Sequence, residues 1–396
     1  MAKHIESLES HPARPSQSLA DHLEGVVDNA DRLIPTDVTT AYGDDWQTIM
    51  SALAWTHDAG KLTTYFKAYL ETGDRTAHDM SRPEYTYHGF VSALLALHVF
   101  HSLDTSDEAR TAGFYAVAKH HGVLPTVQSE YKDYTDSGER VTSKYEVAQG
   151  QLENIDEHAG TAIDDLLTVA SNGNLGWDDT YVESPEVYQD LIEPPESLDE
   201  DFYQTVVRAW STLVCADKLD AASITIPRDR PSRPSLPAFR GQVERLPDGS
   251  TSLEQEMNAL RSRAHENAWE ELLDRYEEGE RLFNIALPTG FGKTLTGLRA
   301  ALELAEKRDG RVIYALPYTS IIDQVDDVCQ EKLHVSPGDP EYTIHHHLAD
   351  TWTDLQRIRE VDRLNDGSES MYAETWQSGL VLTTFTQLFE SVAGPA

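Results

Sequence analysis

The sequence predicts a multidomain protein in which an all-α bundle is followed by part of an α/β domain. Between residues 17 and 122 apolar side chains recur at three- and four-residue spacing, the period of amphipathic helices. Beyond residue 280 short β-type runs alternate with helical segments, as in a parallel sheet. Five prolines between residues 227 and 249 favour an extended linker. We therefore predict domains at 1–226 and 251–396, joined by a Pro-rich linker at 227–250.

The helical domain is expected to be built from five amphipathic segments. They cover residues 17–33, 45–73, 85–103, 107–122 and 201–223. The stretch from about 124 to 200 is acidic and less regular, and it is expected to be a variable excursion from the bundle.

The second domain is predicted to open with a long helix, for which Ser252 and Gln255 form a capping box. Three short runs rich in β-branched and apolar residues follow it and are predicted to be strands. They are RLFNIAL (281–287), RVIYALP (311–317) and GLVLTTF (379–385). Helical segments separate these runs, so the sheet is expected to be parallel.

Acidic residues dominate the charge of the chain, with 68 Asp and Glu against 32 Lys and Arg and a formal net charge of −36. Such a chain either avoids nucleic acid, since phosphate contacts need cations, or works in a high-salt cytoplasm, where repulsion is screened. The acidic residues are spread along the whole chain, and motifs of nucleic-acid enzymes are present. We therefore favour the high-salt explanation.

The two cysteines, Cys215 and Cys329, lie far apart in what are predicted to be different domains. Neither a disulfide framework nor a thiolate zinc site is therefore expected. No apolar run approaches the roughly 18 residues needed to cross a bilayer, and the N-terminus lacks the apolar core of a secretory signal. A cytoplasmic protein with no membrane contact is predicted.

Histidines and aspartates in the helical part predict a divalent-metal site. His57 and Asp58 are predicted to lie inside one helix, about 100° apart around its axis, with Lys61 one turn further on. Such a dipeptide is common, but further histidines and one aspartate occur among apolar residues elsewhere in the helical part. The predicted ligands are His22, His57, Asp58, His88, His120, His121 and Asp217. Imidazole and carboxylate bind first-row divalent ions, and an Asp can bridge two of them.

The segment LPTGFGKT, residues 287–294, lies between a predicted strand and a predicted helix, as a phosphate-binding loop does. Gly290 and Gly292 let backbone N–H groups face phosphates, Lys293 supplies a charge, and Thr294 can bind Mg²⁺. Thr289 belongs to the same predicted ATP site. Leu287 replaces the first glycine of the strict motif, and PTGxGKT is similar to the form in superfamily 2 helicases. We expect no metal at His345, His346 and His347, because alternate residues of an extended run point to opposite faces.

These motifs together resemble the HD superfamily and, more narrowly, the CRISPR-associated nuclease and helicase protein of type I systems. The resemblance rests on THDAGKLTTYF, YHGFVSALLAL, KHHG and ADKLDAA for the nuclease domain. ALPYTSIIDQV (315–325) and TTFTQLFES (383–391) are similar to helicase segments that contact the nucleic-acid strand. Together with the acidic composition, the resemblance leads us to expect a haloarchaeal member with a RecA-like second domain.

The resemblance also implies an activity and a ligand set. One ion would take His22, His57, Asp58 and Asp217, and the second would take Asp58, His88, His120 and His121. Lys61 would contact the scissile phosphate or a water on the metal. The expected substrate is single-stranded DNA, cut in antiviral defence with a guide-RNA surveillance complex as partner. The metal stays open among Mn, Fe, Co, Ni and Mg.

An acidic DExx box and a second RecA-like lobe, which a superfamily 2 motor needs, do not appear before the sequence stops at Ala396. We therefore expect an incomplete helicase lobe with little motor activity, whose remaining lobes could be on a separate chain. Two other functions stay open at this point. One is an HD phosphohydrolase acting on a nucleotide or cyclic nucleotide, and the other is a non-catalytic nucleotide-binding recruitment module.

Overall fold

The computed structural model describes residues 5–77, 82–122, 124, 126–135, 139–180, 199–226, 234, 251–337, 339–346 and 376–393. The chain divides into two compact units, Met1–Arg228 with Ala393–Ala396, and Asp229–Val392. Apart from Pro234, the predicted linker lies outside the described residues. The domain bounds given above therefore stay a prediction.

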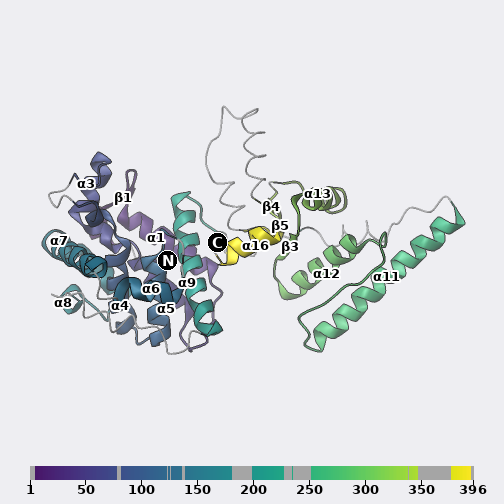
Figure 1. Ribbon diagram of the computed structural model, residues 1–396, viewed down its shortest axis with the longest axis horizontal. Coiled ribbons are helices and arrows are strands. Elements are labelled where there is room, and N and C mark those ends of the chain that lie inside the picture. The colour runs from purple at the N-terminus through teal and green to yellow at the C-terminus, as the bar shows by residue number, and fades with distance from the viewer. Residues whose placement is uncertain are drawn as a thin grey trace. The chain divides into compact units, whose positions relative to one another are not determined.

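The first unit is helical, as predicted (Figure 1). Its helices are α1 (Leu19–Leu33), α2 (Trp46–Thr56), α3 (Thr64–Thr72), α4 (Gly89–Ser102), α5 (Asp107–Ala118), α6 (Val127–Thr135), α7 (Glu139–Ala170), α8 (Trp177–Thr180) and α9 (Glu200–Ala221). Short 3-10 turns, η1 (Glu6–Leu8), η2 (Ala59–Leu62) and η3 (Pro83–Thr86), and a hairpin of β1 (Pro12–Arg14) and β2 (Gln17–Ser18) complete it. None of the described helices is long and apolar enough to cross a membrane.

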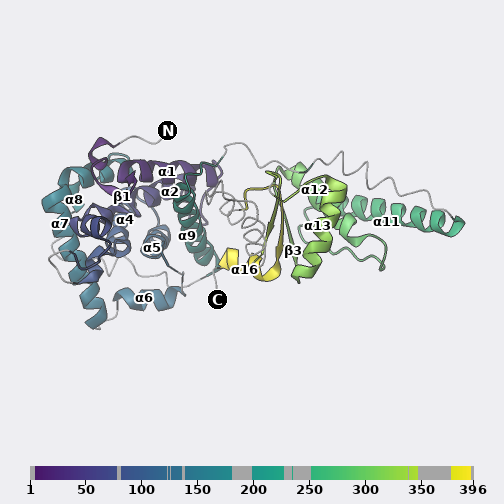
Figure 2. The same ribbon diagram turned by 90° about the horizontal axis from the view of Figure 1, so that it is seen from above.

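The core of this unit forms where α1 packs against α2 and α9, and where α5 packs against α4 and α9 (Figure 2). Leu23 and Val26 of α1, Leu53 of α2, Phe114 of α5 and Leu213 of α9 are all fully buried in it. These residues occupy the apolar stripes from which the helices were predicted. The packing holds the ends of α2, α4 and α5 close together.

The predicted helix over 45–73 is wrong in one respect that matters for the site. Helix α2 ends at Thr56, His57 is its C-cap, and Asp58 has non-helical angles of φ −111° and ψ 13°. The chain then makes the turn η2, in which the Gly60 N–H donates to Ser92 Oγ at 2.9 Å. Periodicity continues across this break because both sides are buried, so spacing alone did not reveal it.

The stretch expected to be an excursion contains the long helix α7, which is part of the core. Ile155, Ile163 and Leu166 of α7 are fully buried. Acidic side chains cover the opposite face of this helix, as in a surface helix that packs on one side. The high acidic content therefore concealed an amphipathic pattern.

The second unit has a three-stranded parallel sheet, which confirms the predicted α/β class. Strands β3 (Val312–Leu316), β5 (Leu380–Thr384) and β4 (Tyr342–His345) lie in the order β3-β5-β4. The helices are α11 (Ser252–Glu277), α12 (Lys293–Arg308), α13 (Thr319–Leu333) and α16 (Phe385–Ala393). Leu298 of α12 and Ile322 of α13 are buried in one cluster with Leu380 and Leu382 of β5.

Two local predictions in this unit are wrong. The run 281–287 forms no strand in the structure, and Leu282 is 92% exposed. The capping box of α11 is made by Thr251 and Glu254, one residue before the predicted pair. Apolar composition favoured a strand at 281–287, but a strand also needs a hydrogen-bonded neighbour, and none of the described strands pairs with this run.

Candidate metal centre

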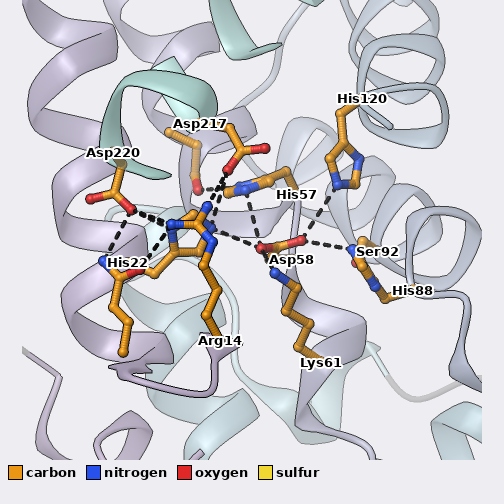
Figure 3. A network of polar contacts seen from close by, with 12 residues as sticks. Arg14, His22, His57, Asp58, Lys61, His88, Ser92, His120, Asp217 and Asp220 are labelled. Atoms are coloured by element: carbon orange, nitrogen blue, oxygen red, sulfur yellow. Dashed lines mark hydrogen bonds and ion pairs between the residues drawn. The ribbon is translucent and has the colours of Figure 1, made fainter. Parts of the chain in front are cut away.

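Asp58 lies at the centre of a buried group of histidines (Figure 3). Three of the contributing segments are helix ends. His57 and Asp58 directly follow α2, His88 is the N-cap of α4, and His120 and His121 lie in the turn after α5. His22 comes from the first half of α1, and Asp217 comes from α9. The turns place short side chains from separate helices around one carboxylate.

The two oxygens of Asp58 face two different sets of imidazoles. Oδ2 lies 2.9 Å from Nε2 of His22 and 3.4 Å from Nε2 of His57. Oδ1 lies 2.9 Å from Nε2 of His88 and 3.4 Å from Nε2 of His120. The Nε2 atom of His121 is 2.8 Å from that of His88. Within each set the donor atoms lie within 4.8 Å of one another, which is close enough for one ion per set.

Backbone carbonyls fix the protonation of two of these rings. Nδ1 of His57 donates to the Ala54 carbonyl at 2.9 Å, and Nδ1 of His120 donates to the Val117 carbonyl at 2.6 Å. In a neutral ring the proton is then on Nδ1, and Nε2 carries a lone pair. Among the described residues neither Nε2 atom has a hydrogen-bond partner, although both are buried. Each lone pair faces the Asp58 carboxylate, an arrangement that a cation between them would satisfy.

The charge states at the site suit metal ligands, because metals bind neutral imidazole and ionised carboxylate. Burial lowers the pKa of His57 to about 4 and that of His88 to about 3. Burial opposes ionisation of Asp58, but the charge of Lys61 and the nearby histidines hold its pKa well below the ordinary value. Burial likewise lowers the pKa of His121 to about 4. At neutral pH these rings are therefore available as lone-pair donors.

Lys61 contacts the same carboxylate. Its Nζ lies 2.5 Å from Asp58 Oδ2, and its side chain is buried against the ring of Phe66. The turn η2 makes this contact possible, since it folds Lys61 back toward Asp58. The Lys61 charge offsets part of the negative charge on the Asp58 carboxylate, which is removed from water.

Asp217, which was predicted to be a metal ligand, lies near His22 and pairs with Arg14. Its Oδ1 accepts from Arg14 Nη2 at 3.0 Å and lies 3.6 Å from Nε2 of His22. Within the described part of the chain it belongs to neither set of donor atoms that lie within 4.8 Å. The predicted role of Asp217 as a ligand therefore stays a prediction.

Asp220, which was not among the predicted ligands, contacts His22. Its Oδ2 lies 2.6 Å from Nδ1 of His22, while Nε2 of His22 faces Asp58. Burial alone would lower the pKa of His22, but the hydrogen bonds with Asp220 and Asp58 raise it. The spacing in the sequence could have indicated Asp220, since it is three residues after Asp217 and lies on the same face of α9.

The predicted phosphate loop precedes α12 in the second unit, with Thr289 in the loop and Thr294 in the first turn of the helix. Gly290 and Gly292 have positive φ angles of 83° and 75°, which glycine adopts without strain. Lys293 Nζ donates to the Leu287 carbonyl at 3.0 Å, and Arg261 Nε donates to the Gly290 carbonyl at 3.0 Å. The loop thus leads into the N-terminus of α12, and its predicted role in binding phosphate stays a prediction.

The histidine run of the second unit is partly described. His345, at the end of β4, accepts a hydrogen bond from Trp376 Nε1 at 2.6 Å, and His346 is buried. His347 lies outside the described residues. The Trp376 contact gives His345 a packing role in the sheet.

Comparison with known proteins identifies both parts of the chain. Residues 7–189 match the family described as Cas3, HD domain, and residues 262–371 match the DEAD/DEAH box helicase family. A CRISPR-associated nuclease/helicase Cas3 of Haloferax volcanii is 30% identical over 373 residues. That match covers 86% of this chain and 39% of the Haloferax protein, so the chain spans well under half of its relative.

Solved structures of T. fusca Cas3 are also similar to the chain. The structure with ATP matches at 15% identity and a TM-score of 0.41, and the structure with AMPPNP matches at 14% identity and a TM-score of 0.45. Both cover 96% of this chain and 43% of the T. fusca chain. On the family matches and the Haloferax relative, the chain carries a Cas3-family HD domain followed by a DEAD/DEAH box helicase segment.

Proposed function

We propose that the helical unit is a divalent-metal-dependent nuclease that cuts single-stranded DNA. The observation that carries this proposal is the pair of buried Nε2 lone pairs, on His57 and His120, that face opposite oxygens of Asp58. A buried carboxylate opposed by unprotonated nitrogens is the donor set of a cation site. The Haloferax relative is a Cas3 nuclease/helicase, which supports this activity.

In the proposed site Asp58 would be a ligand shared by two ions. His22, His57 and Asp217 would complete the first ligand set, and His88, His120 and His121 would complete the second. Two such ions, when bound, would neutralise the charge of a phosphodiester and activate the attacking water. The metal is one of Mn, Fe, Co, Ni or Mg.

The residues of the chain prepare the site in three ways. The carbonyls of Ala54 and Val117 fix the rings of His57 and His120, so that the lone pairs point to the centre. Lys61 holds one oxygen of Asp58 and keeps the carboxylate ionised. We further propose that Lys61 contacts the scissile phosphate or a water on the metal, because its Nζ lies beside the shared Asp58 carboxylate.

We also propose that residues 289–294 bind ATP with Mg²⁺. The positive φ angles of Gly290 and Gly292 and the N-terminus of α12 support this, since the first N–H groups of a helix lack partners within the helix and can bind phosphate. The proposed setting is CRISPR defence in the cytoplasm, with a guide-RNA surveillance complex as partner.

The test is cleavage of single-stranded DNA by the full chain with each of the five divalent ions, at high and low salt. Asp58→Ala should abolish cutting, while Asp201→Ala, which removes an exposed carboxylate of α9, should leave it unchanged. Undiminished cutting by Asp58→Ala would contradict the proposed site. Nucleotides and cyclic nucleotides, offered in parallel, should be poor substrates, and preferential hydrolysis of either would reject DNA as the substrate.

A further inference from the structure

Asp220 lies behind His22, on the opposite side of the imidazole from Asp58 (Figure 3). Oδ2 of Asp220 is 2.6 Å from Nδ1 of His22, and Oδ2 of Asp58 is 2.9 Å from Nε2. A histidine that offers Nε2 to a metal commonly donates its Nδ1 proton to a carboxylate, which fixes the tautomer and the plane of the ring. We propose that Asp220 is the positioning residue that holds His22 in its ligand orientation.

The Asp220 carboxylate is held by the β1–β2 hairpin as well as by its own helix. Gln17 Nε2 donates to Asp220 Oδ2 at 3.0 Å, and Arg14 Nη1 contacts the same oxygen at 3.4 Å. The Asp220 side chain is only 10% exposed. Three partners from the hairpin and α1 thus converge on one oxygen, which leaves Asp220 little freedom to turn away from His22.

Arg14 connects this arrangement to the proposed ligand Asp217. Its Nη2 donates to Asp217 Oδ1 at 3.0 Å, while Nη1 is near Asp220. One guanidinium therefore spans two carboxylates on the same face of α9. The hairpin fixes the relative positions of Asp217 and Asp220, one of which is a proposed ligand while the other supports a ligand.

Glycine at position 25 leaves room for the Asp220 side chain against α1. A Cβ atom at Gly25 would lie 1.9 Å from Oδ1 and 2.9 Å from Cγ of Asp220. Glycine inside a helix costs stability relative to alanine, so a glycine here indicates that close approach matters. Position 25 is three residues after His22, on the same side of α1.

The inference rests on the proposed function, because it assumes that His22 binds one of two ions. The experiment therefore has one readout without metal and one with it. In the metal-free full chain, ¹H–¹⁵N NMR of the His22 ring should show a downfield, slowly exchanging Nδ1 proton. That signal should be lost in Asp220→Ala and in Gly25→Ala, which displaces an intact carboxylate, and it should be retained in Asp220→Asn, which keeps an acceptor.

The second readout is Mn²⁺ binding measured by titration calorimetry. Asp220→Ala and Gly25→Ala should lower the affinity for one of the two Mn²⁺ ions by about 10–100-fold and leave the affinity for the other unchanged. Asp220→Asn should have an affinity between those of Asp220→Ala and the wild type. The controls are Asp201→Ala on α9 and Gly160→Ala, where a Cβ would meet nothing within 4 Å. Both controls should bind like the wild type.

Two results would overturn the inference. One is an Nδ1 proton that persists in both Asp220→Ala and Gly25→Ala, and the other is unchanged affinity for both ions in those variants. A wild-type chain that binds no Mn²⁺ would instead contradict the proposed function. In that case the Nδ1 proton of the metal-free chain would still decide whether Asp220 positions His22.

Discussion

Nε2 of His57 and Oδ2 of Asp58 lie 3.4 Å apart, and the Nε2 atom has no hydrogen-bond partner among the described residues. The same relationship holds on the other side of the carboxylate, between Nε2 of His120 and Oδ1. Two acceptors that face each other in a buried site are unfavourable without a cation. The symmetry about Asp58 indicates two binding positions that can be separated by mutation.

Replacing one histidine on either side should remove one ion and keep the other. We expect His57→Ala and His120→Ala each to bind one Mn²⁺ with near wild-type affinity, because each leaves the opposite set of ligands intact. Asp58→Ala should bind neither ion tightly, since both sets share its carboxylate. Metal analysis and calorimetry measure the stoichiometry, and His158→Ala, an exposed histidine on α7, is the control. Loss of both ions in His57→Ala would contradict separate positions.

Lys61→Met should destabilise the metal-free chain more than the metal-loaded one. The substitution leaves the buried Asp58 carboxylate without the cation 2.5 Å away, and breaking a buried ion pair from one side costs about 3–5 kcal/mol. Bound divalent ions replace the missing charge, so they should recover much of the loss. Urea unfolding with EDTA and with Mn²⁺ tests this. Lys67→Met, an exposed lysine of α3, is the matched control, and equal destabilisation in both media would reject the account.

Gly60→Ala should disturb the turn that carries Asp58 and Lys61. An added Cβ would lie 2.5 Å from Val91 Cγ1 and 2.9 Å from the backbone oxygen of His88. Overpacking of this kind costs about 1–3 kcal/mol, and the displaced His88 should bind its ion more weakly. Thermal unfolding and metal titration measure both effects. Gly160→Ala has open space and should be neutral or stabilising, so a similar loss there would point to a general effect of alanine.

Sequence periodicity predicted the helical bundle and the parallel sheet, because buried faces impose a regular spacing of apolar residues. It did not predict the break after Thr56, since residues on both sides of a buried turn are apolar as well. Helix α7 was missed because its many acidic residues lie on the solvent face. The run 281–287 was overpredicted, because composition does not show whether a partner strand is present.

The histidines and aspartates of the helical part predicted a cluster around Asp58 from the sequence alone. The structure brings His22, His57, His88 and His120 to within 3.4 Å of that carboxylate. Asp220 could not be distinguished from the many surface carboxylates of so acidic a chain. Its importance arises from a contact between α9 and α1 that joins two residues separated by 198 positions in the sequence. Local sequence patterns contain no information about such a contact.

The stability of the helical unit should fall as the pH drops from about 6.5 to 4, with His98 as one cause. Burial in α4, with His101 nearby, lowers the pKa of His98 to about 4 from 6.5. Between these values the unfolded chain binds a proton that the folded chain does not, so stability is complete above pH 6.5 and decreases below it. At pH 5 the lowered pKa of His98 should reduce the free energy of unfolding by roughly 1–2 kcal/mol.

Urea unfolding of wild type and His98→Gln at pH 7.5 and pH 5 tests this prediction in the presence of EDTA. The variant should lose less stability between the two pH values than the wild type does. His158→Gln, which removes an exposed histidine, should behave like the wild type. An identical pH dependence in wild type and His98→Gln would show that folding does not lower the pKa of His98.

Lys293→Ala should weaken ATP binding without changing metal-dependent DNA cleavage. The Nζ atom of Lys293 donates to the Leu287 carbonyl within its own loop, and a nucleotide phosphate would offer it a stronger, charge-assisted partner. Loss of that partner should weaken binding of a fluorescent ATP analogue by about tenfold or more, equivalent to about 1.4 kcal/mol. Lys307→Ala, at the other end of α12, keeps the helix but removes a lysine paired with Glu277 and should bind normally. Equal affinity in Lys293→Ala and wild type would contradict the proposed ATP site, whereas loss of cleavage in that variant would show that the two sites depend on each other.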